Sequence, residues 1–308
     1  MEKSSQLASL LAVATSVLAL TNAGRAASPA SGAELTVAGA VIHIDFERGD
    51  FNDPAAILEW VRRSAQTVAA YYDRFPVKAL TLRLAPSSGD GVHGGKTFAN
   101  PDAFIRVGVG REVTAAQLRD DWVLVHEMTH LALPDTGETH AWLSEGIATY
   151  VEGVARVHAG TRSEEDVWAE ELRSMPRGLP LPDDDGLDHT HSWGRTYWGG
   201  AMFCLQADVR IRESTALRFG LQDALRAVLR ASGGLATDWP IERVLRTGDA
   251  AVGTRTLEDL YARMKDRPEK PDLVALWREL GVEADGDAVR FDEHAPLAAV
   301  RRAIMRVH

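Results

Sequence analysis

The stretch from Val123 to Leu131 reads VLVHEMTHL and places His126 and His130 four residues apart in an otherwise apolar run. Four residues make slightly more than one turn of an α-helix, so both imidazoles project from one face and can reach one metal ion. Zn²⁺ is the usual occupant of such a pair, and Glu127 between the histidines is placed to act on a water molecule. The stretch therefore predicts a helix that carries part of a metal site.

A third ligand is expected, because a catalytic zinc site has three protein ligands and an open fourth position. The next predicted helix, over about 140–157, contains Glu145 in the block AWLSEGIATY (141–150). A carboxylate in an apolar stretch is costly unless it is paired or binds a metal. Gly146 beside it is a poor helix residue, by about 1 kcal/mol relative to Ala, and would let the two metal-bearing helices approach closely. His126, His130 and Glu145 are therefore the predicted ligands of one zinc ion.

Together these two blocks resemble the gluzincin metallopeptidases, and most closely their aminopeptidase-N-like and glycyl-aminopeptidase-like families. In those families a glutamate on the next helix, within a similar Trp-Leu-x-Glu-Gly-x-Ala block, is the third zinc ligand. Fourteen residues separate His130 from Glu145 here, against eighteen in aminopeptidase-N relatives, which shortens the loop between the helices. The resemblance implies a zinc-dependent peptidase in which Glu127 is the general base.

Two further segments extend the resemblance. Tyr197 begins a Tyr-Trp-Gly-Gly block where the families have Tyr-x-Lys-Gly, and this implies that its phenol stabilises the oxyanion. Gly94 and Gly95 open the segment GGKTFAN (94–100), where aminopeptidase-N relatives have a substrate-binding Gly-x-Met-Glu-Asn strand, and this implies contact with the substrate backbone. The amine-binding glutamate of that strand is absent, so aminopeptidase and endopeptidase action both remain open. The alternative interpretations are a core aromatic for Tyr197 and a flexible loop for the glycines.

Secondary-structure signals predict a sheet followed by helices. The strands are expected at 34–46, 77–84 and 103–109. We expect a glycine-rich loop over 87–95, and the strand at 103–109 is expected to pair with an extended peptide as an edge strand. One helix is predicted from its cap Thr114 through Trp122 into the metal motif, and the residues after Thr196 are predicted to be almost entirely helical.

This order indicates an α+β fold, namely a zincin-like (thermolysin-like) metallopeptidase domain with a small mixed sheet and an all-helical C-terminal part. The predicted catalytic domain covers 34–212 and the predicted helical subdomain covers 213–308.

Residues 1–26 have the organisation of a signal peptide. Lys3 precedes the apolar run LASLLAVATSVLAL (7–20), and Gly24 and Ala26 supply small residues before a cleavage site. The run is short for a transmembrane helix. We therefore expect a periplasmic or secreted protein without stable membrane insertion after cleavage, and a retained N-terminal anchor is the alternative.

The formal net charge of -10 argues against a nucleic-acid partner, which would require a basic surface. The expected partner is a peptide or protein substrate, and the oligomeric state is not readable from the sequence. The alternative to an enzyme is a catalytically silent gluzincin-fold module that binds peptides or is structural. Loss of Glu127 or of a ligand would mark such a module, and the sequence retains all of them.

Overall fold

The computed structural model describes residues 32–47 and 51–306. The signal peptide predicted for residues 1–26 lies outside this part of the chain, so its cleavage and the export of the protein stay predictions. Within the described residues, no helix combines the length and apolar character needed to cross a membrane.

The secondary structure follows the predicted order. The strands are β1 (Gly32–Val37), β2 (Ala40–Phe46), β3 (Ala79–Ser87), β4 (Val92–Phe98), β5 (Phe104–Gly110), β6 (Val282–Asp285) and β7 (Ala288–Phe291). The helices are α1 (Pro54–Tyr72), α2 (Ala115–Asp120), α3 (Val123–His130), α4 (Ala141–His158), α5 (Glu164–Ser174), α6 (Gly200–Ser214), α7 (Leu221–Ser232), α8 (Ile241–Val252), α9 (Thr256–Met264), α10 (Leu273–Leu280) and α11 (Ala298–Ile304).

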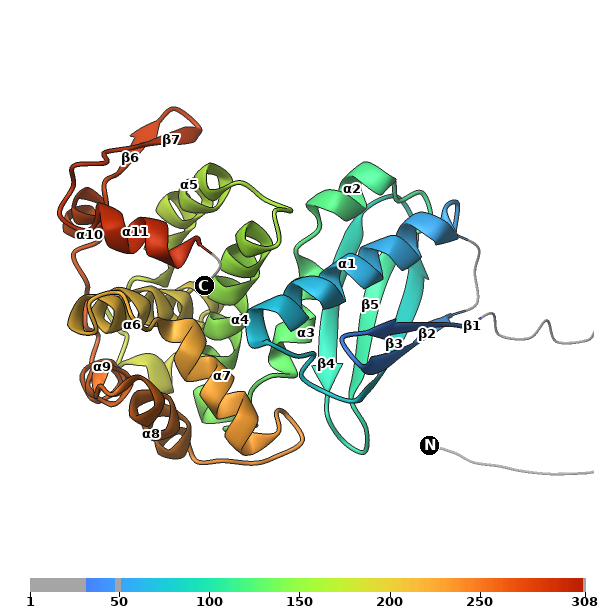
Figure 1. The fold of residues 1–308 in the computed structure, drawn as a ribbon, viewed down its shortest axis with the longest axis horizontal. Coiled ribbons are helices and arrows are strands. Elements are labelled where there is room, and N and C mark those ends of the chain that lie inside the picture. Colours follow the sequence, from blue (N-terminus) through green and yellow to red (C-terminus); the bar gives the residue numbers. More distant parts are fainter. Residues whose placement is uncertain (1–31, 48–50, 307–308) are drawn as a thin grey trace, which may run out of the picture.

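The first five strands form one mixed sheet in the order β1-β2-β3-β5-β4. β2, β3 and β5 run parallel, and β1 and β4 pair antiparallel with their neighbours. Helix α1 crosses one face of this sheet (Figure 1). The α+β fold with a small mixed sheet and a helical C-terminal part is confirmed, and the C-terminal part also carries the hairpin β6–β7.

The prediction that the 103–109 strand forms the sheet edge is wrong. That strand is β5, which lies between β3 and β4. The edge is β4, which begins at Val92 inside the predicted 87–95 loop and pairs antiparallel with β5 through Thr97 and Ile105. Its sequence VHGGKTF is weak in strand-forming residues, so the backbone ladder with β5, and not local propensity, makes it a strand.

The single helix predicted from Thr114 into the metal motif is also wrong, because the chain breaks between α2 and α3. The Asp121 carboxylate accepts hydrogen bonds from the backbone amides of Val123 and Leu124, both at 3.2 Å. It also accepts one from the Trp60 indole of α1 at 3.0 Å. The first backbone amides of a helix have no partner within the helix, and a carboxylate just before it can accept their hydrogen bonds. Asp121 therefore marks the start of a separate helix, α3, about one turn before the metal motif.

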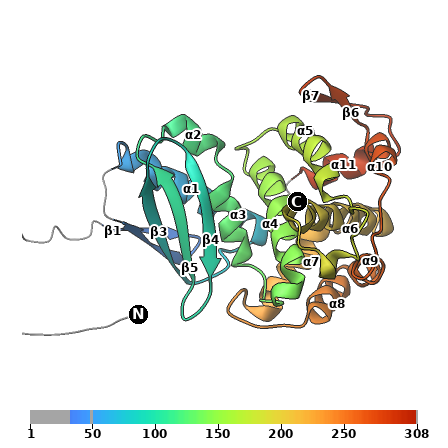
Figure 2. The same cartoon turned by 180° about the vertical axis from the view of Figure 1, so that it is seen from behind.

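Helices α3 and α4 lie at the boundary between the sheet and the helical part in both views (Figures 1 and 2). Gly146 of α4 does not serve the contact with α3 that was predicted for it. A Cβ at Gly146 would lie 2.2 Å from the carbonyl carbon of Gly200, so the glycine allows α4 and α6 to touch through their backbones. The division at residues 212 and 213 stays a prediction, and buried residues from both sides of it form one contiguous core.

Candidate metal and catalytic site

The three predicted ligands come together at the contact between α3 and α4. His126 Nε2 lies 3.1 Å from Glu145 Oε2, and His130 Nε2 lies 3.4 Å from the same oxygen. Within the described residues, these three are the group of His, Cys, Asp or Glu side chains whose ligand atoms all lie within 4.8 Å of one another. Two imidazole nitrogens and a carboxylate oxygen converging in this way fit the donor set of a zinc ion with an open coordination position.

The orientation of His130 is fixed by a neighbour that the sequence interpretation did not assign. Its Nδ1 lies 2.9 Å from the hydroxyl of Ser144, the residue before Glu145. A hydrogen bond to one ring nitrogen orients the ring and leaves the other nitrogen for a metal. His126 is 4% exposed, and its Nδ1 has no hydrogen-bond partner in the described part of the chain.

The charge states of Glu145 and His126 suit metal binding. Burial acts to raise the pKa of the Glu145 carboxyl, but hydrogen bonds and charge from His126 and His130 outweigh it, so this pKa lies well below its ordinary value. Burial lowers the pKa of His126. Neutral imidazole and ionised carboxylate are the forms that coordinate a metal.

Glu127 is buried and contacts the edge strand β4. Its Oε2 accepts a hydrogen bond of 2.6 Å from the Thr97 hydroxyl. Gly95, two residues earlier on β4, is required by this contact, because a Cβ there would lie 2.5 Å from Glu127 Cγ. Both residues lie in the segment GGKTFAN, but the sequence predicted a role only for Gly95, because no local pattern links Thr97 to Glu127.

Tyr197 belongs to a π-helical turn, Arg195–Gly199, that leads into α6. Its ring stacks on His126 with the centroids 5.9 Å apart, and it also stacks with Trp193 at 5.2 Å. Burial, together with the charge of Glu145 and hydrogen bonding to it, raises the pKa of Tyr197. The phenol therefore stays protonated at neutral pH and can act as a hydrogen-bond donor beside the triad.

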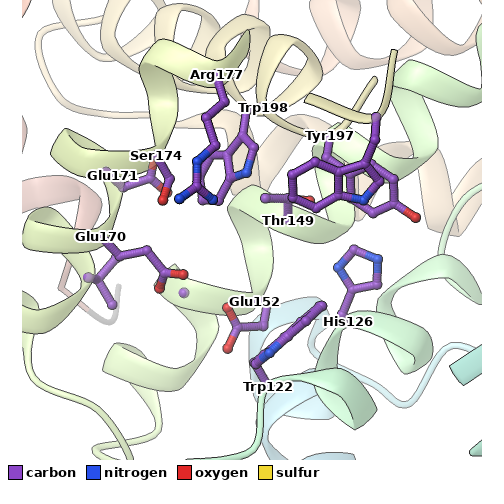
Figure 3. A pocket seen from close by; sticks show the side chains of 13 residues that line it. Trp122, His126, Thr149, Glu152, Glu170, Glu171, Ser174, Arg177, Tyr197 and Trp198 are labelled. Atoms are coloured by element: carbon purple, nitrogen blue, oxygen red, sulfur yellow. The ribbon is translucent and has the colours of Figure 1, made fainter. Parts of the chain in front are cut away.

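Two hollows flank the triad. The first is an open cleft of ≈ 470 Å³, whose lining includes Gly95, Glu127, His130, Glu145 and Tyr197. Gly94 is not among the residues that line it. The second is a smaller cavity of ≈ 200 Å³ whose lining includes His126 and Tyr197 (Figure 3). Of the seven predicted site residues, five therefore line one cleft. His126 adjoins this cleft through its contact with Glu145, and Gly94 lies outside the lining.

The fold is similar to part of the solved structures of M1 zinc metallopeptidases. An aminopeptidase N family protein from Idiomarina loihiensis superposes with a TM-score of 0.64 at 14% identity, over 86% of this chain and 53% of that one. An M1 zinc metallopeptidase from Deinococcus radiodurans superposes with a TM-score of 0.54 at 15% identity, over 79% of this chain and 52% of that one.

A mutant of the Deinococcus enzyme, bound to a Tyr-Ser-Ala substrate, gives the same TM-score at 14% identity, over 78% of this chain and 52% of that one. The chain thus spans about half the length of these structures. No family model matches the chain, and no curated protein matches it by sequence.

Proposed function

We propose that this chain is an exported zinc-dependent peptidase that hydrolyses peptide bonds. The observation that carries the proposal is the convergence of His126, His130 and Glu145 on one point, with Glu127 and Tyr197 in the same cleft. The fold shared with M1 metallopeptidases supports it, and one of those enzymes is recorded with a tripeptide substrate.

Each side chain has a distinct task in this proposal. A zinc ion held by the triad would supply Lewis-acid polarisation of the substrate carbonyl. Glu127 accepts a proton from the attacking water and delivers it to the leaving amine, and Thr97 holds the carboxylate that does so. The Tyr197 phenol donates a hydrogen bond to the oxygen that becomes negatively charged in the transition state.

The edge strand β4 is the proposed surface for the substrate backbone. Gly95, Lys96 and Thr97 of β4 line the open cleft beside Glu127. An extended peptide can add to such an edge through main-chain hydrogen bonds, which carry little sequence preference. Gly95 keeps its proposed substrate-binding role, whereas Gly94 takes a left-handed conformation at φ +94° outside the lining of the cleft. Cleavage from the amino end and internal cleavage both remain compatible with this cleft.

The test combines zinc content with peptide hydrolysis. Purified protein should contain one zinc per chain and should cleave members of a broad peptide library, and Glu127→Gln should keep the zinc while losing the activity. Cleavage that persists in Glu127→Gln would exclude Glu127 as the general base. A wild-type protein that holds zinc, binds peptides and cleaves none would instead establish the silent peptide-binding module.

A further inference from the structure

The smaller cavity beside His126 is enclosed by aromatic and acidic side chains. Its apolar wall includes Trp122, just before α3, Trp198 in the π-helical turn, and Val167 of α5. Glu152 of α4 and Glu170 of α5 point toward one another across the cavity (Figure 3). An apolar pocket with a few convergent polar groups is the usual form of a ligand site.

One carboxyl group in this wall has an unsatisfied oxygen. Glu152 is paired with Arg156 at 2.6 Å, and Glu170 with Arg162 at 2.7 Å. Glu171 is 5% exposed, and its Oε2 has no hydrogen-bond partner within the described residues. A buried carboxyl oxygen without a hydrogen-bond partner is costly, by about 1–3 kcal/mol, so a partner from outside the chain would be favoured there.

The surroundings of Glu171 favour a positively charged donor over a neutral one. Burial, followed by the charges of Glu170 and Glu152, raises the pKa of Glu171 to about 8. A cation placed beside Glu171 would favour the ionised form of its carboxyl group and offset the charges of Glu170 and Glu152. Trp122 and Trp198 also line the cavity, and indole rings attract cations. Arg177, the basic side chain in the lining, is exposed, forms no ion pair with another described residue, and is not among the charges that act on Glu171.

We propose that this cavity binds the basic side chain, lysine or arginine, of the substrate residue beside the scissile bond. The cavity adjoins the reacting centre, because His126 and Tyr197 line it and Tyr197 also lines the open cleft. A long cationic side chain from a peptide in the cleft would pass Tyr197 and reach Glu171. This binding role rests on the proposed peptidase function, for which it names the substrate class.

Binding of small probes to the zinc-loaded full chain tests the cavity without relying on catalysis. The probes are the Nα-acetyl amides of arginine, citrulline, phenylalanine and glutamate, measured by isothermal titration calorimetry. Citrulline has the shape of arginine without its charge, so it separates charge from size. Wild-type protein should bind the arginine probe about tenfold or more tightly than citrulline, because a bound cation favours the ionised form of Glu171 and pairs with it, whereas neutral citrulline does not.

Three variants locate the effect. Glu171→Gln should reduce the preference for arginine over citrulline to about twofold or less, and Glu170→Gln should weaken it, since both carboxylates line the cavity. Glu165→Gln removes the same charge from the solvent-exposed side of α5 and should leave the preference unchanged. Because Gln has nearly the volume of Glu, loss of folding is not expected, and circular dichroism checks it.

The opposite outcomes are clear. Equal binding of arginine and citrulline, tighter binding of phenylalanine or glutamate, no binding of any probe, or an unchanged preference in Glu171→Gln would each overturn the proposal. Peptide hydrolysis, assayed separately, distinguishes the two proposals. A protein that binds arginine and cleaves no peptide refutes the peptidase, whereas one that cleaves peptides without a preference for basic residues refutes the cavity.

Discussion

The hydroxyl of Thr97 on the edge strand β4 lies 2.6 Å from Oε2 of Glu127 and 2.9 Å from the backbone oxygen of the same residue. One hydroxyl hydrogen can be donated to only one of these oxygens at a time. The hydroxyl can therefore bond to either the side chain or the backbone of Glu127, and the 2.6 Å contact with Oε2 is the shorter of the two. Either bond links the proposed general base to the strand on which the substrate is proposed to lie. Thr97 is a positioning residue in this arrangement.

Replacing Thr97 by Val should lower kcat by about tenfold to a hundredfold, because the Glu127 carboxylate loses the group that orients it. KM and zinc content should change little. Thr97→Ser keeps the hydroxyl and should restore most of the activity, which a purely structural role of the side chain would not predict. Equal kcat values for the Val and wild-type proteins would contradict the positioning role.

Adding one methyl group at Gly95 should impair catalysis while leaving the zinc ligands intact. The Cβ of Gly95→Ala would lie 2.5 Å from Glu127 Cγ and 2.9 Å from its Cδ, so the carboxylate or the strand must move. We expect a loss in kcat/KM of about tenfold or more. Gly108→Ala on the neighbouring strand β5 is the matched control, because its Cβ would make only an ordinary contact of 3.5 Å.

Ser144→Ala should weaken zinc binding by about tenfold to a hundredfold, the usual effect of removing a partner that orients a metal-binding histidine. The reason is the loss of the 2.9 Å hydrogen bond to His130 Nδ1. Competition with a zinc chelator measures the affinity directly. Ser214→Ala, at the end of α6, provides a serine control remote from the site, and a similar affinity in both variants would speak against the role of Ser144.

Glu171 should make the protein less stable as the pH rises from about 5 to 8. Its pKa in the folded chain is raised from 4.5 to about 8, so in this window the folded protein keeps a proton that the unfolded chain has lost. The groups whose charges bear on it are Glu170 and Glu152, which raise this pKa, and Arg162, which lowers it; Cys204 also faces it. The contribution of Glu171 to the free energy of unfolding therefore falls by up to ~1.4 kcal/mol per pH unit.

Urea denaturation at several pH values checks this expectation. The difference in the free energy of unfolding between Glu171→Gln and wild type should increase in favour of the variant between pH 5 and 8 and then level off, because glutamine does not titrate. Glu165→Gln changes an exposed residue of the same helix, and its free energy of unfolding should vary with pH as that of the wild type does. Parallel curves for all three proteins would show that Glu171 ionises normally.

Gly146→Ala should destabilise the fold, although alanine is the better helix former by about 1 kcal/mol. The added Cβ would lie 2.2 Å from the carbonyl carbon of Gly200 and 2.3 Å from its Cα, which forces α4 and α6 apart. We expect a loss of about 3 kcal/mol, at the upper end for overpacking. Thermal and urea unfolding measure it, and an increase in stability would show that the helices can separate at little cost.

The residues of the candidate site were largely predicted from the sequence alone. His126 and His130 share a face because helical periodicity is local, and Glu145 stands out as a carboxylate in an apolar helix. Tyr197 was found through a short block that resembles known peptidases. The alternating and helical patterns also predicted most elements, and they failed at β4, where pairing with β5 overrides weak strand propensity.

The sequence by itself predicted the three candidate ligands, the candidate general base and the α+β order, because each prediction depends on patterns within single helices and strands or within two successive helices. Only the tertiary structure showed that Thr97 holds Glu127, that Gly95 makes room for it, and that Gly146 meets Gly200. It also placed Glu171, whose Oε2 has no hydrogen-bond partner within the described residues, in the lining of a cavity shared with His126 and Tyr197. These relationships join segments about 30 or more residues apart, and no local periodicity encodes them, since they arise only when the sheet and the helices pack together.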